Sequence, residues 1–166
     1  MSMNGNFKAL SDAELNALAA DPSRVEQLLF ASLLGGSSKG HEELEIDKAW
    51  HGLHFLLTGT AWEGDFPLNF IATGGQEVGD DLGYGPARAL TSSEVQKIDA
   101  ALEPLRPGEL AERFDAARMT ELDIYPFGWS HDPDGELEYL LDFYAELRAF
   151  VRRTAERENA VLVYLS

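Results

Sequence analysis

The sequence predicts an α+β fold in a single domain spanning residues 1–166, mainly helical around a small mixed or antiparallel sheet. The chain has 166 residues, of which 45% are hydrophobic, and this is enough for one sizeable core. Repeated N-cap signals precede amphipathic segments. The run Ala160–Leu165 is apolar at every position, which is typical of a strand covered on both faces. We therefore expect this C-terminal segment to be the central strand.

Two capping boxes mark helix starts. Ser11 with Glu14, and Thr91 with Glu94, have the spacing at which the cap side chain and the acid three residues later bond each other's backbone N–H. They predict a helix to about Ala20 and a helix ending before Pro107 and Gly108.

Other helices are expected from single signals. The predicted starts are Asp21-Pro22, Asp47, the segment after Pro107-Gly108, and Asp132-Pro133, which opens the longest helix. Gly35-Gly36 and Gly59 are expected to end the second and third helices, and Gly35–Gly40 to form a surface loop. Further strand candidates are Asn6–Leu10, Gln76–Val78 and Ala87–Leu90.

Cysteine is absent, which excludes disulfide scaffolds, thiol catalysis and cysteine-based metal sites. A cysteine-free chain fits a reducing cytoplasm, where we expect the protein. The first eight residues contain no apolar run of signal-peptide length, and no stretch approaches the 18 apolar residues of a membrane span.

The charge balance limits the partners. Thirteen Lys and Arg against 29 Asp and Glu give a formal charge of −16. We expect no nucleic-acid partner and no membrane, because both attract clusters of basic residues. A basic protein partner is compatible with this charge, and acidity also serves solubility alone.

His51 and His54 form a His-x-x-His pair on the helix predicted after Asp47. Histidines three apart can reach one metal, and His41 lies upstream beside two glutamates. The metalloprotease spacing is absent, so we expect no metal. His54 also shares an apolar stripe with Trp50, which favours a hydrogen-bonded core histidine over an acid–base or ligand-binding one.

Asp47 and Lys48 are further candidates. Asp47 is a catalytic carboxylate or, with better support, the helix N-cap. Lys48 is unfavourable beside the positive end of a helix, so it forms a salt bridge or faces a ligand. The run from Asp132 to Glu136 lacks the spacing of a calcium loop, and the glycine-rich turns lack phosphate-loop spacing; we expect no cofactor.

Aromatic residues gather in the predicted loops, where they can line a pocket or an interface, or fill core gaps. They are Trp62, Phe66, Phe70, Tyr84, Tyr125, Phe127 and Trp129.

The segment Ile46–Gly59 resembles the YfbM-like family of small bacterial proteins, a domain of unknown function. The resembling pattern is Ile-Asp-Lys-x-Trp-x-x-Leu-His-x-Leu-Leu-Thr-Gly, in which His51 falls on a variable position. Met1-x-Met-x-Gly, Gly85-Pro86-Ala-Arg88, Ile124-Tyr-Pro126 and the C-terminal Ala160–Ser166 extend the likeness over the chain. The resemblance implies a cytosolic α+β fold and no assigned reaction.

Two hypotheses remain open. The first is a binding module that uses its acidic surface and loop aromatics to engage a basic protein, in the manner of a toxin-neutralising partner. The second is a small enzyme or ligand-binding protein with a pocket near Asp47 and His54, in which these two are the catalytic candidates. The ligand-binding candidates are Lys48, Thr58, Tyr84, Arg88, Tyr125 and Trp129.

Overall fold

The computed structural model describes residues 2–30 and 40–166. Within these residues five strands form one antiparallel sheet: β1 (Gly5–Leu10), β2 (Glu43–Glu45), β3 (Gln76–Val78), β4 (Ala87–Leu90) and β5 (Ala160–Leu165). The helices are α1 (Asp12–Ala20), α2 (Arg24–Phe30), α3 (Ala49–Thr58), α4 (Ser92–Leu102), α5 (Pro107–Ala111), α6 (Ala116–Glu121) and α7 (Pro133–Glu156). The predicted α+β class with an antiparallel sheet is confirmed. The predicted helix end at Gly35-Gly36 lies outside the described residues, as does most of the expected Gly35–Gly40 loop.

The sheet order is β2-β1-β5-β4-β3, which puts the C-terminal strand in the centre as expected. β5 pairs along its whole length with β1, from Gly5 opposite Leu165 to Leu10 opposite Ala160. Its other edge pairs with β4. Strand β2 was not predicted, because three residues with two glutamates show no hydrophobic pattern.

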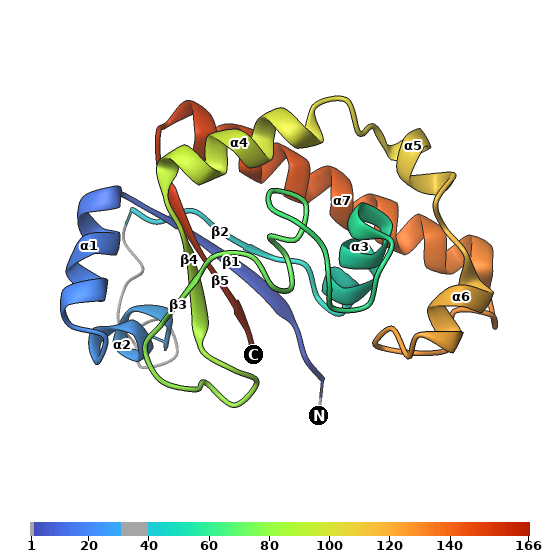
Figure 1. Cartoon of the computed structure of the whole chain (residues 1–166), viewed down its shortest axis with the longest axis horizontal. Coiled ribbons are helices and arrows are strands. Elements are labelled where there is room, and N and C mark those ends of the chain that lie inside the picture. The colour runs from blue at the N-terminus through green and yellow to red at the C-terminus, as the bar shows by residue number, and fades with distance from the viewer. Residues whose placement is uncertain (1, 31–39) are drawn as a thin grey trace.

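Helices cover both faces of the sheet (Figure 1). Alternate residues of β1 divide between the two layers, as the period of two requires: Phe7 and Ala9 belong to the larger core, and Leu10 to the smaller one under α1 and α2. The larger core joins α3, α4 and α7 to the sheet and contains Val161 and Val163. The all-apolar pattern of β5 is thus explained by its burial between two layers.

Most helix starts follow their capping signals, with two exceptions. The start predicted at Asp21-Pro22 is wrong: α2 begins at Arg24, and the Asp21 carboxylate accepts from the Ser23 hydroxyl. Both capping boxes form with the side-chain and backbone bonds expected, and the Asp132 side chain accepts from the Gly135 N–H. The second exception is Asp47, which does not cap α3, so this prediction is also wrong. The N-cap residue is Lys48, which makes no side-chain capping bond, and the Asp47 carboxylate accepts from the Tyr139 hydroxyl instead.

Helix α3 is buried around its whole circumference, not along a single stripe. Every residue from Ala49 to Leu57 is buried. Gly52 lets α7 approach closely, since a Cβ there would lie 2.8 Å from atoms of both Leu140 and Trp129. The described residues include no helix that is long and apolar enough to cross a membrane.

Candidate interaction face

His51 of α3 joins two loops that lie far apart in the sequence. Its Nδ1 accepts the backbone N–H of Tyr125 at 2.9 Å, so this nitrogen carries no proton. Its Nε2 therefore carries the proton and donates to the carbonyl oxygen of Ala61 at 2.8 Å. Burial lowers the pKa of the ring, so the neutral form persists at neutral pH.

His54, one turn further along α3, holds the first of these loops at a second point. Its Nε2 donates to the carbonyl oxygen of Glu63 at 3.0 Å, and the side chain is fully buried. Burial lowers its pKa to about 4. The two histidines thus hold the carbonyls on either side of Trp62.

Trp62 is exposed although the backbone around it is fixed. Its side chain is 56% exposed, while one part of the ring contacts the His51 ring at a centroid distance of 4.3 Å. The buried Trp50 contacts both loops, with a centroid distance of 5.8 Å to the Trp62 ring and 5.9 Å to the Tyr125 ring. The Thr60 hydroxyl, which donates to the Glu63 carbonyl, closes the loop from the other side.

Phe127 is the second exposed ring. Its side chain is 59% exposed and meets Tyr125 edge-on at a centroid distance of 6.1 Å. Its φ of 83° is in the left-handed region, which a bulky side chain rarely adopts and which costs of order 1–3 kcal/mol. We call Trp62, Tyr125 and Phe127 the aromatic face.

A hollow of about 280 Å³ lies beside Trp62. It is lined by Gly59, Thr60, Ala61, Trp62, Glu63, Arg118 and Leu122. Arg118 is paired with Glu121 at 2.7 Å. The two segments that carry the aromatic face, residues 59–66 and 121–134, contain six Asp and Glu and no Lys or Arg. Four of these acids lie in loops, whereas Glu121 ends α6 and Asp134 lies in the first turn of α7.

The structure does not bring Asp47 and His54 to one site. The carboxylate of Asp47 is bonded to Tyr139 of α7 at 2.8 Å, whereas His54 bonds the loop after α3. The backbone N–H of Lys48 donates to the same Tyr139 hydroxyl at 3.1 Å. Catalytic roles for Asp47 and His54 stay predictions.

The ligand-binding candidates are spread through the fold. The Thr58 hydroxyl donates to the His54 carbonyl, and Arg88 donates to the carbonyls of Phe70, Ile71 and Gly74.

Trp129 is fully buried and donates to the Ile124 carbonyl at 2.8 Å, so it belongs to the core. Tyr84 is half-buried in the loop before β4, and the Tyr125 hydroxyl accepts from the Met3 N–H. Only Tyr125 of the candidates belongs to the aromatic face.

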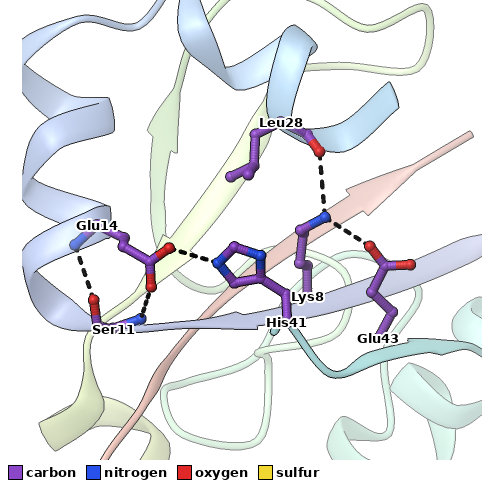
Figure 2. Close-up of polar contacts among 6 residues, drawn as sticks. All are labelled: Lys8, Ser11, Glu14, Leu28, His41 and Glu43. Carbon is purple, nitrogen blue, oxygen red and sulfur yellow. Dashed lines mark hydrogen bonds and ion pairs between the residues drawn. The ribbon is translucent and has the colours of Figure 1, made fainter. Parts of the chain in front are cut away.

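A buried lysine, Lys8, was not anticipated from the sequence. Its side chain is 1% exposed, and its ammonium donates to Glu43 at 2.6 Å and to the Leu28 carbonyl at 3.2 Å (Figure 2). His41 lies nearby and bonds Glu14 at 2.5 Å, not His51 or His54. These contacts join β1, β2, α1 and α2. Within residues 2–30 and 40–166, no three His, Asp or Glu side chains are grouped to hold a metal ion.

Comparison with known proteins defines the class. The chain belongs to the family described as "Domain of unknown function (DUF1877)", whose model matches residues 1–164. The relatives include Protein YfbM of Escherichia coli (strain K12), which is 28% identical over 98% of both chains. The crystal structure of YfbM, described as a protein of unknown function, matches with a TM-score of 0.72 and 26% identity, over 98% of this chain and 99% of that one. The YfbM-like resemblance is therefore confirmed.

Proposed function

We propose that this protein is an interaction module that binds a basic protein through the aromatic face. The observation that carries the proposal is the double role of His51, whose two ring nitrogens hold the loops of both Trp62 and Phe127. One specific form of this function is the neutralisation of a basic toxin. The absence of cysteine fits a cytoplasmic setting for it.

Exposed aromatic rings are the side chains that contribute most to protein interfaces. Trp and Tyr dominate hot spots because they bury large areas while few rotatable bonds are fixed. Trp62 and Phe127 are more than half exposed, and their backbone is already held in place. A preorganised ring loses little conformational freedom on binding, which favours affinity.

The charge of the chain indicates the sign of the partner. A formal charge of −16 steers a basic protein toward the surface and opposes association with a second copy of the same chain. The six carboxylates of residues 59–66 and 121–134 lie close in the sequence to the aromatic rings, and this acidity favours a basic partner there. We therefore favour a basic protein over self-association.

The experiment compares capture of proteins from bacterial extract by the immobilised wild type and by the double variant Trp62→Ala/Phe127→Ala. The wild type is expected to retain basic proteins at about 50 mM salt and release them at about 500 mM, because salt screens the attraction. The double variant is expected to lose them.

Phe66→Ala is the matched control, since Phe66 is 38% exposed but is not one of the three rings of the aromatic face. Circular dichroism and urea unfolding verify that all variants are folded. Retention of the same basic proteins by the double variant, or no retention by the wild type at low salt, would contradict the proposal.

A further inference from the structure

The hollow beside Trp62 has the shape and lining of a receptor for one side chain. Its lining includes the apolar Ala61 and Leu122, the aromatic Trp62 and the exposed Glu63. His51 covers one part of the indole, so the 56% exposed part of Trp62 is free for a ligand.

We infer that this hollow binds an arginine side chain of the partner. The inference rests on the proposed function and names the group that is recognised. A guanidinium can stack on the face of an indole and pair with a carboxylate at the same time. Its three-carbon stem would cover Ala61 and Leu122, while its charge would meet Glu63.

Arginine fits this lining better than lysine does. The guanidinium is planar and weakly hydrated, so it stacks on an aromatic ring without losing its in-plane hydrogen bonds, whereas an ammonium is a compact and strongly hydrated charge. An acidic or apolar partner side chain would leave Glu63 repelled or unpaired.

Arg118, which also lines the hollow, does not oppose this binding with a free charge. Its Nη1 donates to Glu121 at 2.7 Å within α6, and both side chains are more than half exposed. Besides Glu121, the segments 59–66 and 121–134 contain five Asp and Glu and no Lys or Arg, so a negative field remains around the hollow.

The test uses two peptides of equal charge, Gly-Arg and Gly-Lys repeated six times, titrated into the full-length protein. Calorimetric titration measures the affinity of the wild type and of every variant. The indole N–H signal of Trp62 reports binding at the hollow in variants that keep this residue, since Trp50 and Trp129 are buried. The arginine peptide is expected to bind at least about threefold more tightly and to shift the Trp62 indole signal.

Variants separate the contacts. Trp62→Ala is expected to abolish the arginine preference, and Glu63→Gln to reduce it. Glu26→Gln is the matched control, because it removes one exposed carboxylate from α2, on the other layer of the sheet.

The outcomes distinguish the two proposals. Equal binding of both peptides, with both weakened by Trp62→Ala, would overturn the arginine inference and leave the aromatic face as a binding site for basic proteins. Binding that no variant at Trp62 weakens would contradict the proposed function as well. Loss of the arginine preference in Trp62→Ala and a reduced preference in Glu63→Gln, with an unchanged preference in Glu26→Gln, would support the inference.

Discussion

Replacing His51 with phenylalanine tests how the aromatic face is held. The substitution keeps an aromatic ring in contact with Trp50 and Trp62 but removes the hydrogen bonds to Ala61 and Tyr125. Each lost hydrogen bond costs about 1 kcal/mol net, and a buried partner left unsatisfied costs about 1–3 kcal/mol. Ala61 and Tyr125 are only partly buried, so water can reach them in part. We therefore expect a loss of about 2–4 kcal/mol in the free energy of unfolding.

Urea unfolding followed by circular dichroism measures this loss, and acrylamide quenching measures the exposure of Trp62. We expect stronger quenching in His51→Phe, because the loop is held at fewer points. His131→Phe is the matched control, since His131 is exposed, and it should change stability by less than about 0.5 kcal/mol. A loss below about 1 kcal/mol with unchanged quenching would refute the reasoning.

Three other predictions follow from buried polar groups. Because burial lowers the pKa of His54 from 6.5 to about 4, the unfolded chain takes up a proton before the folded one does, so His54 contributes its full stability above pH 6.5 and loses it as the pH falls toward 4. When the pH is lowered from 7.5 to 5, the free energy of unfolding of the wild type should fall by about 2 kcal/mol more than that of His54→Leu, as measured by urea unfolding at each pH. Equal decreases in the two proteins would contradict a buried neutral ring. Arg88→Lys should lower the stability measured by thermal unfolding by about 1–3 kcal/mol, because an ammonium cannot reach three carbonyls as the planar guanidinium does. Arg24→Lys, at an exposed position, is the control and should leave the stability unchanged. Glu43→Ala should destabilise the protein by about 2–4 kcal/mol, because it leaves the buried Lys8 ammonium without its counter-ion. Lys8→Met should cost less than about 1 kcal/mol, because it removes that ammonium. A larger loss for Lys8→Met than for Glu43→Ala in chemical denaturation would contradict this account.

The parts of the fold that depend on neighbouring residues could be predicted from the sequence. The capping boxes at Ser11 and Thr91 act over three residues, and the apolar run at Ala160–Leu165 shows its burial directly. Lys8 could not be anticipated, because its burial depends on Glu43, 35 residues away, and on a carbonyl of α2.

The role of the histidine pair also depends on distant backbone groups. The spacing predicted that both histidines lie on one helix, which is confirmed. Their partners lie on irregular loops whose carbonyl and N–H positions no side-chain pattern encodes. For the same reason the sequence predicts Asp47 as a cap: it does not show that the hydroxyl of Tyr139, 92 residues away, donates to the Asp47 carboxylate.

The most direct test of the account is the proton position on the two buried imidazoles, measured by long-range ¹H–¹⁵N correlation spectra at pH 7. We predict that His51 and His54 are both neutral with the proton on Nε2, because each Nε2 donates to a loop carbonyl beside Trp62. A proton on Nδ1 of His51, or a charged ring at pH 7, would contradict the claim that this histidine holds both loops of the aromatic face.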